Sequence, residues 1–334
     1  MKYKLGELVQ IKYGKDHKKL EDGNIPVYGT GGLMRKVNDF LYSGESVLIP
    51  RKGSLNHVMF VTDKFWTVDT MFWTKIDNKK VLPKYLYYCL SKLDLSALNV
   101  GSAVPSLTVK ILNEINLEIP SLDSQRKVIK KIEPIERKIV LNNQINDNLL
   151  ELLNAQYKHL LSKHNLAKVK LSELCDISAG GDKPKKISKM KSNENLVPVY
   201  SNGTNKDGLY GYTNKAKIFK KAVTISARGT IGYTVLRTEP FVPIVRLISL
   251  QSKGAISAEF LYLLISNLSI QGYGSTQQQI TVPYMKKIVV NIPSLNLINK
   301  FQKEISPLFN QIDRNKRENE QLTNIRNVLL DKFF

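Results

Sequence analysis

The sequence predicts an α+β protein in which two similar strand-rich domains alternate with two long helices. Three observations predict this fold class: short motifs recur once along the chain, each half opens with short β-branched and aromatic runs, and each half closes with a long glycine-free segment of helical periodicity. A chain of 334 residues has room for two domains of ordinary size. We therefore expect domains at residues 1–120 and 166–293, and helices at 121–162 and 294–334.

The recurring motifs show how the two halves correspond. Residues 4–8 recur at 170–174, 25–31 at 197–203, 51–54 at 227–230 and 119–122 at 292–295, with offsets of 166, 172, 176 and 173. The early loops therefore differ in length, whereas the later part keeps one spacing. Apolar runs bounded by Gly, Pro and Asn predict short strands and turns in both domains, with a short helix near 83–93 and another near 258–267.

The two long helical segments carry a narrow seam with the 4-3 spacing of a coiled coil. The residues expected at the contact between the helices are Ile132, Ile135, Ile139, Asn142, Asn146 and Leu149 in the first, and Ile305, Leu308, Ile312, Asn315, Asn319 and Leu322 in the second. The first seam continues through Leu153 and Gln156. Pro134 and Pro307 occupy equivalent positions and predict a kink or a first-turn boundary in each helix.

Paired asparagines in the seam indicate a fixed register, because a buried asparagine costs stability and can specify how helices pair. The second domain follows directly on the end of the first helix, which favours an antiparallel, pseudo-two-fold symmetric pair. That arrangement would place Asn142 near Asn319 and Asn146 near Asn315. In the alternative, each helix packs on its own domain as an ordinary long helix.

The charge balance indicates the class of partner. The chain has 50 Lys and Arg against 29 Asp and Glu, a net charge of +21. This excess favours nucleic acid as the binding partner, with an acidic membrane as the second possibility. No apolar run approaches the ~18 residues of a membrane span, and the N-terminal segment lacks a signal-peptide pattern. Two cysteines fit a reducing compartment. We therefore expect a cytoplasmic protein with double-stranded DNA as its partner.

The candidate DNA-binding residues lie on basic or glycine-rich loops, where Lys and Arg bind phosphates and Arg, Asn and Gln can read base edges. They are Tyr28, Thr30, Arg51, Lys52, Ser54 and Asn56 in the first half, and Lys183, Lys185, Lys186, Tyr200, Asn202, Arg228, Thr230, Ser275 and Gln277 in the second. These loops also have structural alternatives: the lysines can form a solvated loop, the glycines can serve simply to turn the chain, and the tyrosines can fill a core.

These motifs together resemble the specificity subunit of a type I restriction-modification system, over the whole chain. The resemblance is carried by Ile25-Pro26-Val27-Tyr28 and Val197-Pro198-Val199-Tyr200, by the Ile-Pro-Ser-Leu turns at 119 and 292, by residues 106–109 and 279–282, and by the proline-containing helices. It implies that each domain is a target-recognition domain that reads one half of a bipartite DNA sequence, and that the helices are a spacer that docks two methyltransferase (modification) subunits. Because the domains differ from one another, the target is expected to be asymmetric.

The resemblance also implies that restriction subunits join the complex and that S-adenosylmethionine, ATP and Mg act on partner subunits. This chain has no Asn/Asp-Pro-Pro-Tyr/Phe signature, no Gly-x-x-x-x-Gly-Lys-Ser/Thr loop, and only scattered histidines and cysteines. We therefore expect no catalytic residue, metal or cofactor of its own. Two alternatives stay open: a DNA-modifying or DNA-cleaving enzyme with an unrecognised active site, and a coiled-coil adaptor that does not bind DNA.

Overall fold

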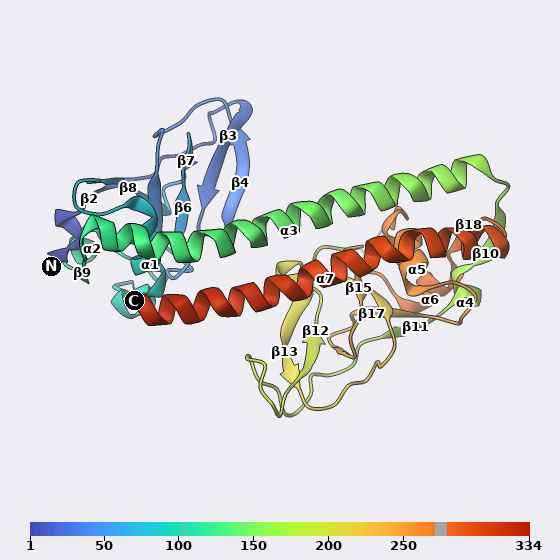
Figure 1. Cartoon of the computed structure of the whole chain (residues 1–334). Coiled ribbons are helices and arrows are strands. Elements are labelled where there is room, and N and C mark those ends of the chain that lie inside the picture. Colours follow the sequence, from blue (N-terminus) through green and yellow to red (C-terminus); the bar gives the residue numbers. More distant parts are fainter. Residues whose placement is uncertain (102, 271–278) are drawn as a thin grey trace. The chain divides into compact units, whose positions relative to one another are not determined.

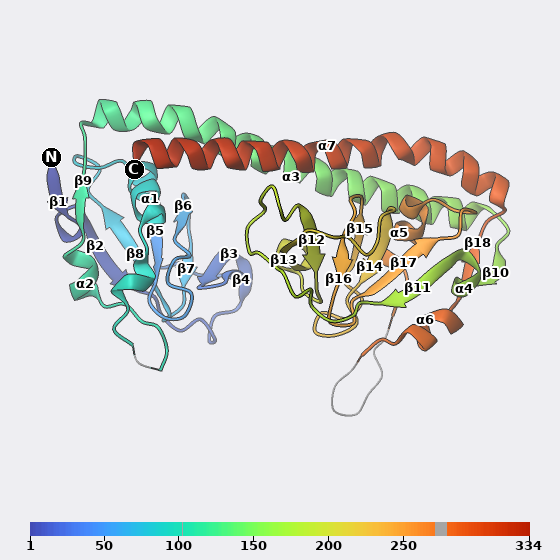
Figure 2. The same ribbon diagram turned by 90° about the horizontal axis from the view of Figure 1, so that it is seen from below.

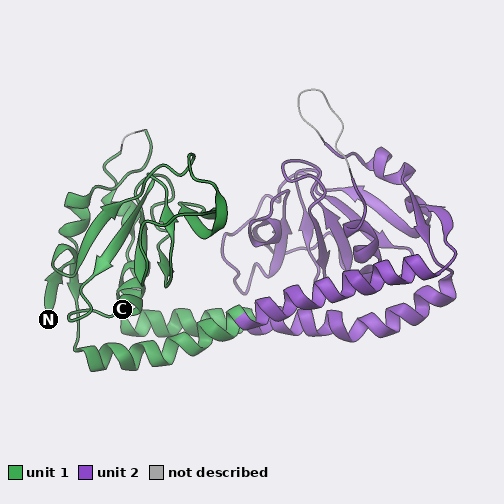
Figure 3. Ribbon diagram, turned by 90° about the horizontal axis from the view of Figure 1, so that it is seen from above, with its two compact units in different colours: residues 1–140, 319–334 green, residues 141–318 purple. Residues whose placement is uncertain are grey.

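The structure is a computed structural model that describes residues 1–101, 103–270 and 279–334. The chain forms two compact units (Figure 3). Unit 1 comprises Met1–Val140 and Asn319–Phe334, and unit 2 comprises Leu141–Glu318. Each long helix begins in one unit and ends in the other, so each unit contains a piece of both helices.

The described part of unit 1 contains three small sheets, one of which lies beside the short helix Pro83–Lys92 (Figures 1 and 2). Its elements are β1 (Lys2–Lys4), η1 (Leu5–Glu7), β2 (Val9–Tyr13), β3 (Asp22–Gly29), β4 (Gly32–Val37), β5 (Ser46–Pro50), β6 (Met59–Val61), β7 (Trp66–Thr67), β8 (Met71–Ile76), α1 (Pro83–Lys92), η2 (Leu95–Leu98), α2 (Val109–Asn113), β9 (Asn116–Glu118) and the start of α3 (Leu122–Lys163). The sheet orders are β1-β9, β2-β8-β5-β6 and β4-β3-β7. Only the β3–β7 pair is parallel among the described pairs of strands in this unit.

Unit 2 repeats this plan. Its elements are β10 (Ala167–Lys170), α4 (Leu171–Leu174), β11 (Cys175–Ala179), β12 (Val197–Tyr200), η3 (Asn205–Gly208), β13 (Leu209–Thr213), β14 (Ala222–Ile225), β15 (Thr234–Arg237), β16 (Val242–Pro243), β17 (Ile248–Ser252), α5 (Ala258–Ser266), α6 (Val282–Lys287), β18 (Val289–Ile292) and the start of α7 (Leu295–Phe333). The sheet orders are β10-β18, β11-β17-β14-β15 and β13-β12-β16, and β12–β16 is again the parallel pair.

The repetition extends to single hydrogen bonds. The Leu5 amide donates to the Ile115 carbonyl at 2.8 Å, and the Leu171 amide donates to the Ile288 carbonyl at the same distance. The Ser-Leu-Thr-Val and Gln-Ile-Thr-Val motifs share a local cause, because Thr108 and Thr281 are the N-caps of α2 and α6 and each hydroxyl accepts a backbone amide at 3.3 Å. The two domains are therefore repeats of one architecture.

The long helices pack on the shorter helix of each domain as well as on each other. In unit 1, Ile132 of α3 and Leu330 of α7 are buried with Tyr88 of α1. In unit 2, Tyr157 of α3 and Phe301 of α7 both contact Phe260 of α5, edge to face. Each long helix therefore packs on the short helices of both domains.

The residues expected at the contact between the helices are all buried or half-buried. Ile132, Asn142, Asn146, Ile305, Ile312 and Asn315 are buried, and Ile135, Ile139, Leu149, Leu308, Asn319 and Leu322 are half-buried. Farther along α3, Leu153 and Tyr157 are buried and Gln156 is exposed, so placing Gln156 in the seam was wrong. A straight helix has 3.6 residues per turn, and a strict 3.5-residue pattern drifts off its face with distance.

Both prolines lie well inside their helices. Pro134 is the thirteenth residue of α3 and Pro307 is the thirteenth residue of α7, so the first-turn alternative was wrong, and a kink at each proline stays a prediction.

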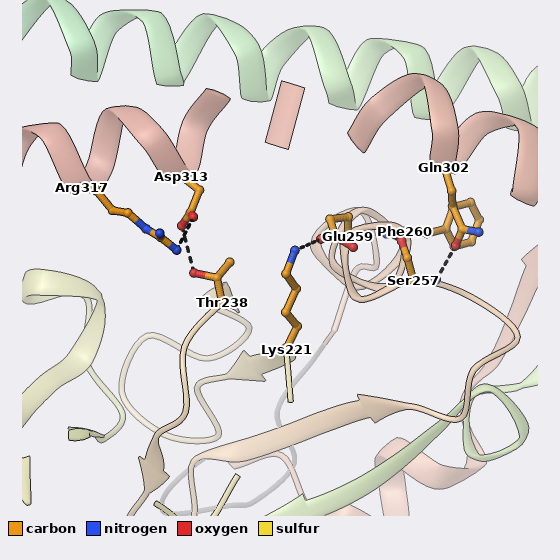
Figure 4. A network of polar contacts seen from close by, with 8 residues as sticks. All are labelled: Lys221, Thr238, Ser257, Glu259, Phe260, Gln302, Asp313 and Arg317. Atoms are coloured by element: carbon orange, nitrogen blue, oxygen red, sulfur yellow. Dashed lines mark hydrogen bonds and ion pairs between the residues drawn. The ribbon is translucent and has the colours of Figure 1, made fainter. Parts of the chain in front are cut away.

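A glutamine from each long helix caps the shorter helix of its domain. Gln125 Oε1 accepts the backbone amide of Leu82, the N-cap of α1, at 2.7 Å. Gln302 Oε1 accepts the backbone amide of Ser257, the N-cap of α5 (Figure 4). These bonds link the domains to the long helices, and the sequence pattern gave no sign of them.

Polar side chains pair across the two long helices near the boundary of unit 2. The Asn315 side-chain amide donates to Asn146 Oδ1 at 2.8 Å, and the Asn142 amide donates to Glu318 Oε2 at 2.7 Å. Residue numbers rise along α3 as they fall along α7, so the helices run antiparallel here. The sequence also paired Asn146 with Asn315.

The asparagine pair gives a stability prediction. Asn146→Ala removes an acceptor from a buried amide and should lower the free energy of unfolding by about 1–3 kcal/mol. Replacing both Asn146 and Asn315 by Leu should recover most of that loss, because no buried amide is then left unpaired. Urea unfolding measures both. The matched control is Asn148→Ala, an exposed position on the same helix. An unfolding midpoint for Asn146→Ala equal to that of Asn148→Ala would contradict the role of the pair.

Candidate nucleic-acid interface

The loop between β5 and β6 of unit 1 is held against the segment that precedes α2. The Arg51 carbonyl accepts the Leu107 amide at 2.9 Å, and the Gly53 amide donates to the Pro105 carbonyl at 2.9 Å. Gly53 has φ +87°, in the left-handed region that residues with a Cβ avoid. The sharp turn and these two backbone bonds place the side chains of residues 51–57 on one rigid loop.

The cationic side chains of this loop differ in whether they already make contacts within the protein. Arg51 Nη1 donates to the Asp69 carbonyl at 3.1 Å, and its guanidinium lies 5.3 Å from the centre of the Tyr13 ring. Lys52 and Ser54 are exposed. Lys52 can therefore reach a phosphate without breaking an internal bond, whereas Arg51 is partly engaged.

A cavity of about 550 Å³ lies beside this loop. It is lined by Gly53, Ser54, Leu55, Asn56, His57, Ser96, Asn99 and Pro105. Both polar groups of the Asn56 side chain are hydrogen-bonded within the protein. Its Nδ2 donates to Asp94 Oδ1 at 3.0 Å, and its Oδ1 accepts the Ser96 backbone amide at 3.0 Å. Any base contact by Asn56 would have to displace one of these bonds.

Two further residues at this cavity, Asn99 and His57, were not among the candidate DNA-binding residues. Asn99 Oδ1 accepts the backbone amides of Gly101 and Ser106, each at 2.8 Å, and so links these residues to the end of η2. His57 Nδ1 lies 2.7 Å from the carbonyl oxygen of Thr30 and joins the β3–β4 turn to the β5–β6 loop. The pattern of an asparagine two residues before a glycine could have indicated the first; nothing in the sequence marked the second.

Unit 2 has the same loop with different side chains. The Ala227 carbonyl accepts the Ile280 amide at 3.0 Å, the counterpart of the Arg51–Leu107 bond, and Gly229 has φ +70°. Arg228 donates to Gln279 Oε1 through Nε at 3.3 Å and Nη2 at 3.0 Å. Thr230 is exposed at the turn.

Asn202 connects three segments of unit 2. Its Oδ1 accepts the Ala227 amide at 2.8 Å, and its Nδ2 donates to the Val245 carbonyl at 2.6 Å. Val245 and the next residue both have positive φ, so the turn that supplies this carbonyl is strained. Asn202 therefore holds the loops around Ala227 and Val245 in position.

The dense basic segment of unit 2 is an exposed stretch fastened to β13. Lys183, Lys185 and Lys186 are exposed. The Lys186 carbonyl accepts the Thr213 hydroxyl at 2.8 Å, and Ser188 exchanges two backbone hydrogen bonds of 2.8 Å with Tyr212. The lysines therefore form a fixed patch of positive charge.

The two tyrosines expected at DNA are largely packed in the protein. Burial raises the pKa of both Tyr28 and Tyr200. The Tyr200 ring lies 3.6 Å beneath the Arg237 guanidinium, which donates to the Thr224 hydroxyl at 2.9 Å and the Asp207 carbonyl at 2.6 Å. Ser275 and Gln277 lie outside the described residues, and their predicted contacts stay predictions.

Charged and polar contacts connect the strand-rich part of unit 2 to α7 (Figure 4). The Thr238 hydroxyl donates to Asp313 Oδ1 at 3.0 Å, and Arg317 pairs with the same carboxylate at 2.9 Å. Beside these contacts, Lys221 Nζ, just before β14, lies 2.7 Å from Glu259 Oε1 on α5. Burial alone would raise the pKa of Glu259, but the hydrogen bond from Lys221 and the positive charge of that residue hold it below its ordinary value.

The described residues offer no site for metal or thiol chemistry. In that part of the chain, no group of three His, Cys, Asp or Glu side chains is arranged to hold a metal ion. Cys89 and Cys175 are both buried, and burial raises the pKa of each thiol to about 12. None of the helices in residues 1–101, 103–270 and 279–334 combines the length and apolar character needed to cross a bilayer.

Comparison with known proteins identifies relatives over nearly the whole chain. A family model described as the type I restriction modification DNA specificity domain matches residues 1–151 and 163–326. The chain is 29% identical over 326 residues to a putative type I specificity subunit of Mycoplasma pneumoniae, covering 92% of this chain and 88% of the relative. It is 22% identical to the specificity subunit of the type I restriction enzyme HindI of Haemophilus influenzae, covering 89% and 86%.

A solved structure shares the fold. The crystal structure of the S subunit of the type I restriction-modification system from M. genitalium aligns with a TM-score of 0.61 at 18% identity, covering 100% of this chain and 96% of that chain.

The Asn202 contacts give a prediction for the loops of unit 2. Asn202→Ala leaves the buried Ala227 amide without its acceptor and should destabilise the fold by about 1–3 kcal/mol. Hydrogen exchange at the Ala227 amide should accelerate, because that amide loses its partner. Asn214→Ala, an exposed asparagine of the same unit, is the matched control. Unchanged exchange at Ala227 in Asn202→Ala would contradict the positioning role.

Proposed function

The chain belongs to the family of type I restriction-modification specificity subunits, the non-catalytic subunits that recognise DNA in those systems, and on that premise we propose that it reads a bipartite, asymmetric target. Subunits of this family assemble with methyltransferase and restriction subunits and bind DNA. The observation that carries the proposal is the duplicated domain with divergent loops. Two copies of one binding architecture suit two half-sites, as in other proteins that read paired sites on a duplex.

The divergence lies in the loops that the shared framework presents. Between β2 and β3 unit 1 has eight residues, 14–21, whereas between β11 and β12 unit 2 has seventeen, 180–196, including the lysine patch. The β5–β6 loop presents Arg51, Lys52 and Ser54, and its counterpart presents Arg228 and Thr230. Different donors and acceptors on equivalent loops read different base pairs, so the two halves of the target differ.

In this proposal most of the net charge of +21 contacts phosphates. Lys52, Lys183, Lys185 and Lys186 are exposed on fixed loops and suit this task, since phosphate contacts set register without reading sequence. Arg228 has the donor geometry for a guanine edge once it leaves Gln279. Asn56 and Asn202 act through the loops that they hold.

We further propose that α3 and α7 form an antiparallel coiled-coil spacer with pseudo-two-fold symmetry. The Asn146–Asn315 bond and the antiparallel order of the contacts in unit 2 support it. Exposed residues of α3, such as Arg137, Asn148 and Glu151, with their counterparts on α7, would dock two methyltransferase subunits. S-adenosylmethionine, ATP and Mg then act on the partner subunits, and the complex works in the cytoplasm.

The experiment is methylome sequencing of a host that carries the methyltransferase subunit with and without this chain. The expected result is a modified motif split into two different halves by a fixed number of unread base pairs, present only with the chain. A continuous motif, a palindromic motif or no new motif would contradict the proposal.

A control separates recognition from catalysis. Purified chain incubated alone with plasmid DNA, Mg²⁺ and S-adenosylmethionine should neither cut nor methylate it. Either activity from the chain alone would favour the enzyme alternative.

A further inference from the structure

The β5–β6 loop of unit 1 presents more hydrogen-bond donors than acceptors to a DNA duplex. Arg51 and Lys52 donate only, and the exposed Ser54 hydroxyl rotates and can donate or accept. The amide groups of Asn56 and Asn99 are engaged in internal bonds. Donors of this kind suit phosphates and the O6 and N7 atoms of guanine. They cannot recognise the exocyclic amino groups of adenine or cytosine, which need an acceptor.

His57 supplies an acceptor at this place. Its Nδ1 lies 2.7 Å from the Thr30 carbonyl oxygen, and a carbonyl only accepts, so Nδ1 must carry the proton. In the neutral ring the other nitrogen, Nε2, is then a bare acceptor. The side chain is exposed at the edge of the cavity of about 550 Å³, and within the described part of the chain Nε2 has no hydrogen-bond partner.

The orientation of the ring is fixed from two sides. The His57 backbone amide donates to the Ser54 carbonyl at 3.3 Å, which closes a turn, and the Nδ1 bond ties the ring to the β3–β4 turn. A fixed acceptor loses little freedom when a base approaches, and this favours discrimination between bases. The glycine turn at Gly53 holds the same loop in place.

The position of unit 2 that matches His57 carries no imidazole. At the offset of 176 that relates residues 51–54 to 227–230, the position matching His57 is Tyr233. The Tyr233 hydroxyl donates to Asp207 Oδ1 at 2.7 Å, and the side chain is half-buried. Any base preference that comes from His57 is therefore confined to the half-site read by unit 1.

Resting on the proposed function, we infer that His57 is a specificity-determining residue that selects an amino-bearing base, adenine or cytosine, at one position of the half-site read by unit 1.

The test is selection of full-length chain on a pool of synthetic duplexes with a randomised segment, at pH 8, above the range in which histidine ordinarily takes up a proton. The wild-type chain should enrich a split motif in which one position prefers adenine or cytosine. His57→Ala should lower that preference by about fivefold, the value of one hydrogen bond, and leave the other positions of both halves unchanged. His159→Ala, an exposed histidine on α3, is the matched control and should keep the wild-type motif.

The outcomes are distinguishable. A split wild-type motif that is unchanged in His57→Ala would overturn the role of His57 and leave the proposed function intact. Weaker enrichment at every position of that half would also overturn it, since that result indicates a residue that only supports the loop. No split motif from the wild-type chain would overturn the proposed function, and the role of His57 with it. The second half-motif reports that each variant is folded.

Discussion

The packing of both long helices on the short helix of each domain is the contact on which the rest of the structure depends. Leu330 of α7 completes the cluster around Tyr88 and Ile132 in unit 1, and Tyr157 of α3, its equivalent at an offset of 173, packs on Phe260 in unit 2. Unit 1 is therefore built from two separate stretches of chain, Met1–Val140 and Asn319–Phe334, and unit 2 includes the end of α3. Each recognition domain obtains part of its core from the helix that belongs to the other half of the sequence.

This exchange has a consequence for how specificity can change. The parts that hold each domain together are repeated, down to the amide of Leu5 with Ile115 and of Leu171 with Ile288. The loops carried by that framework differ in length, charge and available hydrogen-bonding groups. Side chains such as Asn99 and Asn202 keep the loops rigid, and exposed groups on the same loops remain available to DNA. Under the proposed function, loop substitutions that leave the core untouched can therefore produce a new target.

The sequence predicted the features that depend on local pattern and repetition. The helices expected at 121–162 and 294–334 compare with Leu122–Lys163 and Leu295–Phe333. What it could not predict depends on partners far apart in the chain: Gln125 with Leu82, Asn56 with Asp94, and His57 with Thr30. The exposed Gln156 shows a second limit, because a 3.5-residue pattern drifts by about 20° per heptad from the face of a helix with 3.6 residues per turn.

The central claim is that one chain binds a DNA duplex at two separate places through two different surfaces. Protection of guanine N7 from methylation by dimethyl sulfate, measured with the full chain bound to its own target, tests this most directly because N7 lies in the major groove. The account predicts two protected clusters of different sequence with unprotected guanines between them. A single continuous cluster, or two clusters of identical sequence, would contradict it.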